Sequence, residues 1–285
     1  HSGFWQLSLE KESRDCTGFN HNNTNYRFCR LPMGAATSPA WFQKAMTKTF
    51  SGIKMSSVIV YQDDVLISGR NANDLLEKME EVFLRLRQAQ WRMHPAKCFW
   101  GVDRVKFLGF IWDKNGMSTD PEKVRLINNW PRPSSIKSLK SFLGVVGFYR
   151  KFCKGFAQIT APLRRLLHKN QPYTWDDKCE AAFIQLKQTL VSAPTLSLPD
   201  NSKQFYLLCD GALTGISYIL SQKDEQGRLH PISFGGRGLN PHEARYTVTE
   251  IEILAAVTGI QEYSVYLRDG PFPFVLQVDH AAIKF

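Results

Sequence analysis

The sequence lacks the marks of membrane, secreted and zinc-binding proteins. It holds no signal peptide and no run of about 18 uncharged apolar residues, the length that a membrane-spanning helix needs. Its six cysteines include no Cys-x-x-Cys pair, which argues against a structural zinc site. Six widely spaced cysteines in a chain of this size are typical of reduced thiols rather than of a disulfide framework. Internal repeats and low-complexity tracts are also missing.

The composition that remains is that of an ordinary globular protein. The 285 residues (32.6 kDa) are 43% hydrophobic and 22% charged, which excludes a disordered chain. At roughly 150 residues per domain, this length predicts about two domains. Because the sequence starts at His1 rather than Met and stops at Phe285 just after an apolar run, we expect a piece of a longer polyprotein.

The basic charge is concentrated in the middle of the chain. Lys and Arg number 36 against 26 Asp and Glu, a net charge of +10. Residues 121–190 carry a net charge of +9, whereas residues 1–120 carry +4 and residues 191–285 carry −3. Basic residues interleaved with aromatic ones suit a surface that follows a nucleic-acid backbone. The alternative is a solvated surface over an aromatic core, and we expect Phe142, Leu143 and Phe148 to be core residues.

Alternating and 3.6-residue hydrophobic patterns predict a mixture of strands and helices. The expected strands span residues 4–9, 26–30, 105–112, 205–209, 216–221, 231–234 and 274–278, with a hairpin at 57–68. The expected helices span residues 38–50, 73–91, 137–148, 179–190 and 249–263. Prolines near residues 121–133 and 194–199 separate the regions, as expected for domain boundaries.

Two adjacent carboxylates, Asp63 and Asp64, stand at the centre of the predicted hairpin. Neighbouring carboxylates repel each other and partial burial adds to the cost, so a divalent cation would stabilise both. Mg²⁺ prefers hard oxygen ligands and uses one or two protein carboxylates together with substrate phosphates. Successive strand side chains point to opposite faces, so a metal site would need a further carboxylate from a neighbouring strand. The simpler alternative is an Asp-Asp hairpin turn without metal.

Motifs along the whole chain resemble those of reverse transcriptases. Tyr61-Gln62-Asp63-Asp64 resembles their Tyr-x-Asp-Asp box. Other palm motifs with this resemblance are Ser2-Gly3-Phe4-Trp5-Gln6, Leu31-Pro32-Met33-Gly34 with Ser38-Pro39-Ala40 and Phe42-Gln43, and the primer-grip sequence Phe107-Leu108-Gly109. The motifs that resemble the thumb and connection of Gypsy-type LTR retrotransposons are Trp130-Pro131-Arg132-Pro133, Ser141-Phe142-Leu143-Gly144 and Phe148-Tyr149-Arg150-Lys151-Phe152.

The resemblance implies roles for individual residues. Asp63 and Asp64 would be two of three palm carboxylates that bind Mg²⁺ or Mn²⁺ for two-metal nucleotidyl transfer. The residues expected to contact the incoming nucleotide are Phe4, Met33, Gly34 and Tyr61, although Phe4 and Met33 equally suit packing. The residues expected at the primer and along the nucleic acid are Leu108, Gly109, Lys137, Lys140, Arg150 and Lys151.

One departure from the family concerns the third palm carboxylate. In the family this aspartate precedes the Ser-Gly-Phe segment, and here that position falls before His1. The fingers, which grip the incoming triphosphate, fall outside the sequence as well. We therefore expect the 285-residue chain alone not to polymerise DNA at a useful rate. Primer extension by this chain at ordinary polymerase rates in Mg²⁺ would contradict that expectation.

A second acidic set, Asp210, Glu252 and Asp279, occurs in the last 85 residues. Asp210 follows a predicted strand, Glu252 lies on a predicted helix, and Asp279 follows the last predicted strand. Carboxylates at strand ends and on a facing helix can converge on one metal site, although each one alone is more often structural. Together they resemble the ribonuclease H domain of these polymerases, whose metal-activated water cleaves the RNA strand of an RNA–DNA hybrid. The Glu-x-Leu-Ala spacing of that family favours Glu252 over Glu250.

This second match is incomplete. Cys209-Asp210-Gly211-Ala212 stands where the family has Asp-Ala-Ser, and Phe234-Gly235-Gly236-Arg237 stands where it has Ser-Arg. A fourth acidic residue of the family would lie beyond Phe285.

The resemblance implies an α+β fold in three parts. A polymerase palm, an antiparallel sheet plus helices, is expected at 1–118, a helical thumb and connection at 119–198, and a C-terminally truncated α/β ribonuclease H-like domain at 199–285. The implied partners are an RNA template, a DNA primer, the RNA–DNA hybrid, dNTPs and the protease and integrase of a Pol polyprotein, with no membrane partner and a dimer left open. The implied location is the cytoplasm, in a virus-like particle, with a nuclear stage left open.

Three functions compete at this point. The first is a reverse transcriptase with ribonuclease H activity. The second is a catalytically inactive, nucleic-acid-binding remnant of a retrotransposon polymerase. The third is a structural subunit that supports an intact polymerase. The intact carboxylates at both predicted centres favour the first function.

Overall fold

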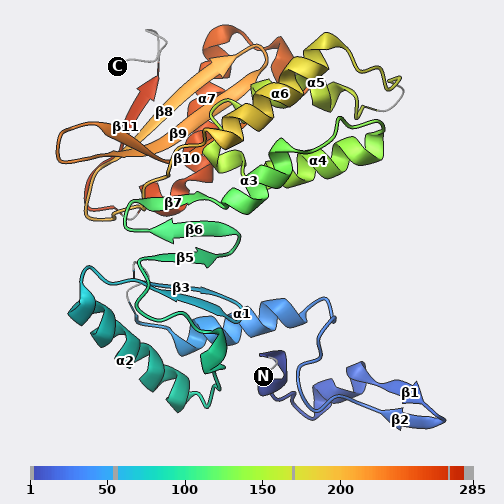
Figure 1. Ribbon diagram of the computed structural model, residues 1–285, viewed down its shortest axis with the longest axis vertical. Coiled ribbons are helices and arrows are strands. Elements are labelled where there is room, and N and C mark those ends of the chain that lie inside the picture. Colours follow the sequence, from blue (N-terminus) through green and yellow to red (C-terminus); the bar gives the residue numbers. More distant parts are fainter. Residues whose placement is uncertain (1–2, 54–56, 169–170, 269, 279–285) are drawn as a thin grey trace. The chain divides into compact units, whose positions relative to one another are not determined.

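The computed structural model describes residues 3–53, 57–168, 171–268 and 270–278. The chain forms two compact units, His1–Val102 and Asp103–Phe285 (Figure 1). Among the described residues, no helix is long and apolar enough to cross a membrane. Both units combine helices with antiparallel strands, which confirms the predicted α+β class. The predicted domain boundaries after residues 118 and 198 stay predictions.

The first unit is built on a β-hairpin covered by two helices. β3 (Val58–Tyr61) and β4 (Asp64–Ile67) pair antiparallel. α1 (Ser38–Thr49) packs on β3, and α2 (Ala72–Gln88) packs on β4. The buried core of the unit consists of Leu31, Phe42, Met46, Phe50, Val58, Val82 and Leu86. The hairpin and both helices predicted for this region are therefore confirmed.

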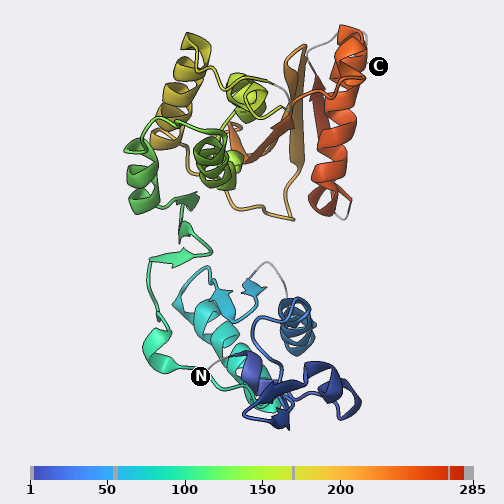
Figure 2. The ribbon, with the colours of Figure 1, turned by 90° about the vertical axis from the view of Figure 1, so that its right-hand side faces the viewer.

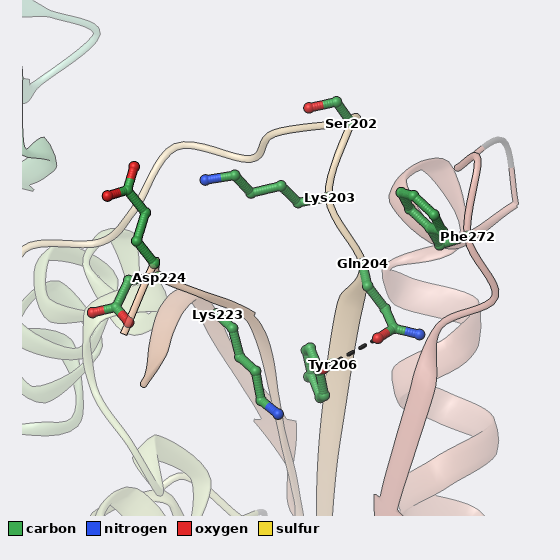
Figure 3. Close-up of a pocket in the computed structure, with 8 residues that line it drawn as sticks. Ser202, Lys203, Gln204, Tyr206, Lys223, Asp224 and Phe272 are labelled. Atoms are coloured by element: carbon green, nitrogen blue, oxygen red, sulfur yellow. Dashed lines mark hydrogen bonds between the residues drawn. The ribbon is translucent and has the colours of Figure 1, made fainter. Parts of the chain in front are cut away.

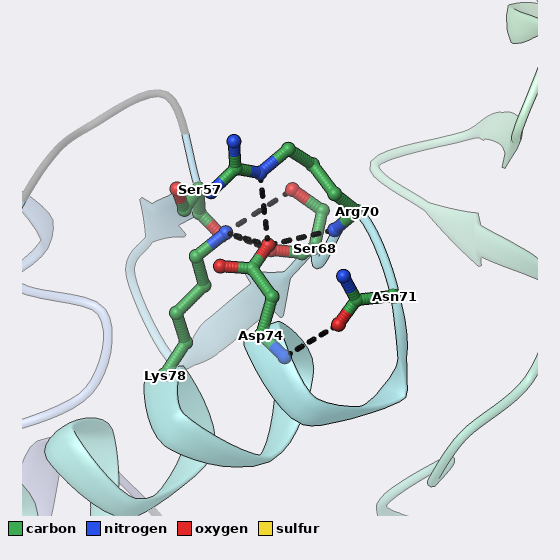
Figure 4. Close-up of polar contacts among 6 residues, drawn as sticks. All are labelled: Ser57, Ser68, Arg70, Asn71, Asp74 and Lys78. Atoms are coloured by element: carbon green, nitrogen blue, oxygen red, sulfur yellow. Dashed lines mark hydrogen bonds and ion pairs between the residues drawn. The ribbon is translucent and has the colours of Figure 1, made fainter.

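A polar cluster joins the end of β4 to the start of α2 (Figure 4). Asn71 caps α2 by accepting a hydrogen bond from the backbone N–H of Asp74 (2.9 Å). The Asp74 carboxylate accepts the backbone N–H of Arg70 (2.7 Å) and the ammonium of Lys78 (2.9 Å), which also donates to the carbonyl of Ser68 (3.0 Å). The hydrogen bonds from Arg70 and Lys78 lower the pKa of Asp74 to about 2. The start of α2 is thereby fixed against the hairpin.

Residues 4–9 do not form the predicted strand, and that prediction is wrong. Phe4–Gln6 is a 3₁₀ turn. The Phe4 ring packs on Phe42, with ring centroids 4.9 Å apart. The Gln6 side chain exchanges two hydrogen bonds with the backbone of Arg92 (2.7 and 3.1 Å). These contacts with residues distant in sequence outweigh the local alternation of apolar and polar residues.

A short hairpin of exposed residues precedes α1. β1 (Phe19–His21) pairs antiparallel with β2 (Thr24–Tyr26). The strand predicted at 26–30 is confirmed only at its first residue, and beyond it a single β-bridge joins Arg30 to Ser8. The predicted strand was therefore wrong over most of its length.

The second unit begins with a three-stranded antiparallel sheet. Its strands are β5 (Arg104–Phe107), β6 (Phe110–Asp113) and β7 (Gly116–Thr119). The prediction of one strand at 105–112 is wrong, because the chain reverses at Leu108-Gly109. The φ angle is 50° at Leu108 and 79° at Gly109. A leucine rarely adopts a positive φ, so its presence masked the turn in the sequence.

Four helices follow this sheet. They are α3 (Pro121–Asn128), α4 (Ile136–Phe148), α5 (Phe156–Arg165) and α6 (Asp177–Val191). α4 and α6 confirm the two helices predicted for the middle of the chain. Their buried side chains meet in one core, where the rings of Phe142 and Phe183 lie 4.8 Å apart.

A four-stranded sheet in the order β10-β9-β8-β11 completes the second unit. Its elements are β8 (Phe205–Ala212), β9 (Gly215–Lys223), β10 (Leu229–Arg237) and β11 (Val275–Val278), with β11 parallel to β8. α7 (Val248–Glu262) and the short α8 (Ser264–Leu267) lie between β10 and β11 in the chain. Figure 2 shows α7 on one face of this sheet and the group of helices α3–α6 on the other. The strands and the helix predicted here are confirmed.

Candidate functional site

The two carboxylates of the first predicted centre lie at the tip of the β3–β4 hairpin. Tyr61 pairs with Asp64, which leaves Gln62 and Asp63 as a two-residue loop. Gln62 has a φ of 51°, which is uncommon for a residue with a side chain. Partial burial and the neighbouring charge of Asp63 raise the pKa of Asp64. The folded hairpin therefore disfavours the negative charge that a divalent cation would neutralise.

The Gly3-Phe4 segment reaches this hairpin. A Cβ placed on Gly3 would lie 3.4 Å from the Cβ of Asp63 and 2.9 Å from the ring of Phe42. The backbone at residue 3 therefore passes against the two-residue loop Gln62-Asp63, called the carboxylate loop below. Only a glycine fits between this loop and Phe42. Phe4, predicted as a nucleotide contact, packs its ring on Phe42 at the same place.

The loop that carries Met33 and Gly34 leads into α1. Ser38 at the start of α1 donates a hydrogen bond from its hydroxyl to the carbonyl of Pro32 (2.7 Å), which anchors the loop. Met33 is 55% exposed, and Gly34 has a φ of 89° with open space on its side-chain position. Tyr61 of β3 is also exposed. Their contacts with a nucleotide stay predictions.

The predicted primer grip is the sharp turn between β5 and β6. The hydroxyl of Tyr149 donates a hydrogen bond to the carbonyl of Gly109 (3.2 Å). The Phe148 ring stacks on Phe110, with centroids 4.9 Å apart and planes 5° from parallel. The prediction that Phe148 is a core residue is wrong, because it is 52% exposed. Its ring covers the turn, which holds the Leu108-Gly109 loop against the end of α4.

The four basic residues predicted to contact nucleic acid differ in their surroundings. Lys137 and Lys140 of α4 and Arg150 just after it are exposed. Lys151 is half-buried, with its ammonium 3.7 Å from the centroid of the Phe110 ring, and burial lowers its pKa to about 8. Lys151 thus packs on the sheet, and its contact with nucleic acid stays a prediction.

The second predicted centre lies where β8 meets α7. Asp210 is an exposed residue near the end of β8, opposite Ser217 of β9. A Cβ on the next residue, Gly211, would lie 2.8 Å from the backbone nitrogen of Glu252. Helix α7 therefore touches β8 at this glycine, which accounts for glycine at a position where the ribonuclease H family has alanine. The contact places the backbone of Glu252 against the residue that follows Asp210, across a wide sequence separation.

Burial separates Glu252 from its neighbour Glu250 on α7. Glu252 is 6% exposed, and its charge adds to burial in raising the pKa of the Cys209 thiol to about 12. Glu250 is exposed and forms a capping box with Thr247, whose backbone N–H donates to its carboxylate (2.7 Å). Glu250 therefore stabilises the start of α7, and Glu252 is the one that lies beside β8.

Asp279, the third predicted carboxylate of this centre, lies outside the described residues. The residue before it, Val278, ends β11 and pairs in parallel with Cys209 of β8. The described part of β11 therefore ends opposite Cys209, one residue before Asp210.

The donor groups at both centres suit a hard divalent cation. Among the described residues, no group of three or more His, Cys, Asp or Glu side chains lies together. The first centre nevertheless has two adjacent carboxylates, Asp63 and Asp64, and in the second the residue after Asp210 contacts the backbone of Glu252. Two carboxylates are the protein share that Mg²⁺ commonly uses when substrate phosphates supply further oxygens. The residues present are therefore consistent with Mg²⁺ or Mn²⁺.

A hollow of the second unit is lined by residues at the start of β8 and the end of β9 (Figure 3). It has a volume of about 340 Å³, and its lining includes Lys203, Tyr206, Lys223 and Asp224. The Lys223 ammonium lies 4.7 Å from the centroid of the Tyr206 ring. Tyr206 stands near the beginning of β8, whereas Asp210 stands near its end, so this hollow is not part of the carboxylate centre.

Comparison with protein families assigns both units. Residues 1–112 match the family described as reverse transcriptase (RNA-dependent DNA polymerase). Residues 175–274 match the RNase H-like domain found in reverse transcriptase. The chain belongs to the reverse transcriptase family. The carboxylate hairpin lies in the polymerase match, and Asp210 and Glu252 lie in the RNase H-like match.

Relatives of this reverse transcriptase are transposon polyproteins. It is 34% identical over 284 residues to the retrovirus-related Pol polyprotein from transposon 412 of Drosophila melanogaster, covering 100% of this chain and 23% of that protein. It is 29% identical to the transposon Tf2-3 polyprotein of Schizosaccharomyces pombe, covering 98% of this chain and 21% of that protein. The chain thus spans about a quarter of the length of these relatives.

Solved structures support the fold of this reverse transcriptase. The foamy viral protease-reverse transcriptase in complex with RNA/DNA hybrid is 24% identical, with a TM-score of 0.80 over 93% of this chain and 36% of that one. The foamy viral protease-reverse transcriptase dRH in complex with double-stranded DNA gives a TM-score of 0.79 at 24% identity, over 93% of this chain and 46% of that one. The arrangement of helices and sheets is therefore that of a viral reverse transcriptase.

Sequence reasoning predicted the carboxylates, whose roles stay predictions, but it did not single out several contacts around the two centres. Gln43, which hydrogen-bonds to the carboxylate loop, had only been part of a motif. Phe148 had been assigned to the core. Its helical spacing from Lys137, Lys140 and Gly144 could have indicated instead that it lies on the exposed face of the helix. The close approach of α7 to Gly211 had no signal beyond the departure from the family pattern.

Proposed function

We propose that this chain carries the palm and the ribonuclease H centre of an RNA-directed DNA polymerase. The observation that carries the proposal is the exposed Asp63-Asp64 pair at a hairpin tip, where the pKa of Asp64 is raised by burial and by Asp63. A fold that needed only a turn would not hold two carboxylates where one of them resists its charge. The proposed substrates are an RNA template, a DNA primer and dNTPs.

The polymerase residues act by holding and orienting the reactants. Asp63 and Asp64 would hold Mg²⁺ or Mn²⁺, which supplies Lewis-acid polarisation of phosphate oxygens when bound. Phe4 packs on Phe42 beside the carboxylate loop, so its ring lies where the sugar of a nucleotide could rest on it. Met33 and Gly34 lie on the anchored loop before α1, and their exposure leaves them accessible to a nucleotide.

The ribonuclease H residues have a parallel role. Asp210 and Glu252 would hold the same kind of cation with Asp279 as the third ligand, a proposal supported by the contact of Gly211, the residue after Asp210, with the backbone of Glu252. Glu252 is buried at the contact of α7 with β8, so a rigid element sets the position of its carboxylate. The proposed reaction is hydrolysis of the RNA strand in an RNA–DNA hybrid.

A labelled RNA–DNA hybrid tests this function directly. The longest reading frame that carries these residues is expected to cleave the RNA strand in Mg²⁺ and to lose cleavage with EDTA. The variant Asp210→Asn is expected to bind the hybrid and leave it intact, whereas Glu225→Gln, at an exposed position between β9 and β10, is expected to cleave it normally. Binding without cleavage by the unmodified protein would instead support an inactive nucleic-acid-binding remnant.

The proposed nucleic-acid surface follows the outer face of α4. Lys137, Lys140, Gly144 and Phe148 are exposed and follow one another at helical spacings of three and four residues. A Cβ on Gly109 would lie 3.1 Å from the Phe148 ring, so this stripe continues into the primer-grip turn. Two ammonium groups, a smooth glycine and an exposed ring suit the backbone and sugars of a duplex.

The salt dependence of duplex binding tests this surface. Replacing Lys137 and Lys140 with alanine is expected to reduce the slope of log affinity against log salt by about 2, because each phosphate contact contributes about 0.9. The control variant Lys114→Ala/Lys178→Ala removes the same charge from exposed positions outside the stripe. Equal loss of slope in both variants would show that only net charge matters and would contradict the proposed surface.

We also propose the cellular setting implied by the relatives. The parent protein would be a Pol polyprotein with protease and integrase, acting in cytoplasmic virus-like particles. The names of the relatives, a retrovirus-related Pol polyprotein and a transposon polyprotein, support the polyprotein part of this proposal.

A further inference from the structure

The Gln43 side chain holds both sides of the carboxylate loop. Its Oε1 accepts a hydrogen bond from the backbone N–H of Gln62 (2.7 Å). Its Nε2 donates to the carbonyl of Val60 (3.3 Å) and to the hydroxyl of Thr47 on its own helix (3.3 Å). Gln43 lies on α1, so one side chain connects this helix to the hairpin on either side of Tyr61.

The residue that Gln43 contacts, Gln62, has an uncommon backbone conformation. Gln62 has a φ of 51°, in the left-handed region that residues with a Cβ seldom occupy. Two-residue hairpin loops place glycine or asparagine where φ must be positive, and this loop has a glutamine instead. The conformation must therefore be maintained by contacts from outside the loop, and the hydrogen bond from Gln62 to Gln43 is such a contact.

The chemistry of the contact selects glutamine at residue 43. A backbone N–H needs an acceptor, and a backbone carbonyl needs a donor. A side-chain amide offers both groups, whereas glutamate offers only acceptors and lysine only donors. The backbone N–H of Gln62 and the carbonyl of Val60 also define the orientation of the Gln43 amide. In the reversed orientation the NH₂ group would face the N–H, and the amide oxygen would face the carbonyl.

We propose that Gln43 is a positioning residue that holds Gln62 in its left-handed conformation and so fixes where the Asp63 carboxylate lies. Asp63 directly follows Gln62, so a change in the backbone at residue 62 redirects the carboxylate. The inference rests on the proposed function in one respect, namely that Asp63 and Asp64 bind a divalent cation. Gln43 itself is not a metal ligand in this proposal.

A double variant separates positioning from simple packing. In Gln43→Met the side chain keeps its length and loses all three hydrogen bonds, including the two to the hairpin. Glycine adopts positive φ without strain, so Gln62→Gly supplies the loop conformation without help from Gln43. A role limited to packing α1 on the hairpin would not be rescued by a change at residue 62.

The experiment measures the 285-residue chain by NMR with Mn²⁺ as the probe. In Gln43→Met, the amide of residue 62 is expected to exchange with solvent about tenfold faster, as for the loss of one hydrogen bond. The Kd for Mn²⁺, read from paramagnetic broadening at the loop, is expected to rise about tenfold, the loss typical of removing a residue that orients a metal ligand. Gln88→Met, at an exposed position at the end of α2, serves as the matched control and is expected to change neither value.

Recovery of Mn²⁺ binding in the double variant is the decisive test of the proposal. Gln43→Met/Gln62→Gly is expected to bind Mn²⁺ within about twofold of the unmodified chain while its residue 62 amide stays in fast exchange. An unchanged Kd in Gln43→Met, or no recovery in the double variant, would overturn the proposal. If the unmodified chain binds no Mn²⁺, the metal assignment fails, and the backbone chemical shifts of residue 62 then decide. Retention of its left-handed conformation in Gln43→Met would overturn the positioning role, and its loss would support it.

Discussion

Replacing Asp64 with asparagine is expected to abolish most DNA synthesis while leaving the fold at least as stable. Asparagine keeps the size of the side chain and removes its charge. The loss of one charge-stabilising group of a catalytic centre lowers the rate by about 10²- to 10³-fold. Primer extension by the longest reading frame that carries these residues measures this loss, with Glu77→Gln on the exposed face of α2 as the control.

The expected stability change follows from the direction of the Asp64 pKa. Burial and the charge of Asp63 raise the pKa of Asp64 above its usual 3.8 in the folded chain, so folding favours the protonated form. The wild-type chain therefore loses stability as pH rises from below 3.8 through the raised pKa. Asp64→Asn carries no such charge and does not undergo this loss.

Denaturant unfolding at several pH values checks that difference. The midpoint of Asp64→Asn is expected to match or exceed the wild-type midpoint at pH 7, and the two are expected to converge at low pH. A variant that loses activity because it unfolds would show the opposite order. An active and destabilised Asp64→Asn would contradict the assignment of Asp64 as a metal ligand.

Glutamine at residue 252 is expected to stop hybrid cleavage, whereas glutamine at residue 250 is expected to leave it nearly unchanged. Glu252 is buried at the contact of α7 with β8, and its backbone meets Gly211 beside Asp210. Loss of its charge is expected to lower cleavage by about 10²- to 10³-fold, as for other groups that stabilise charge at a reacting centre. Cleavage of the RNA strand in a labelled hybrid measures the effect.

The comparison with Glu250 makes the test specific. Both residues lie in the first turns of α7, two positions apart, and both substitutions remove one negative charge. Glu250 accepts the backbone N–H of Thr247, and this contact lowers its pKa. Glu250→Gln should weaken only the capping box, which a small fall in the unfolding midpoint would register. Equal activity losses in the two variants would remove the basis for assigning Glu252 to the centre.

Local sequence patterns predicted the elements that carry the two centres. The hairpin at Asp63-Asp64 was predicted correctly because β-branched runs on both sides of a polar pair leave few alternatives. Strand β8 and helix α7 were predicted correctly because residues 205–209 form a continuous apolar run and residues 249–263 are a long, mostly apolar stretch without proline. The assignment of Asp210 and Glu252 to one centre followed from family resemblance alone and stays a prediction, which the contact of Gly211 with the backbone of Glu252 supports.

The failures have a common cause, since each involves a contact that sequence neighbours do not contain. Residues 4–9 alternate like a strand, but Phe4 packs on Phe42 and Gln6 binds the backbone of Arg92. The turn at Leu108-Gly109 was hidden because Leu108 adopts a φ usual for glycine, and the residues that contact the turn at Gly109, Phe148 and Tyr149, are distant in sequence. The support of the Asp63 loop by Gln43 was hidden for the same reason.

The parallel strand β11 has a consequence for synthesis of the chain. β11 pairs with β8, yet about 70 residues separate the starts of the two strands, with β9, β10 and α7 made in between. At 5–20 residues per second, the ribosome needs roughly 4 to 14 s to cover that interval. During this time one edge of the apolar strand β8 is unpaired, which exposes a template for pairing with another nascent chain. Crowded translation of one transcript would therefore favour association between newly made copies before the last strand closes the sheet.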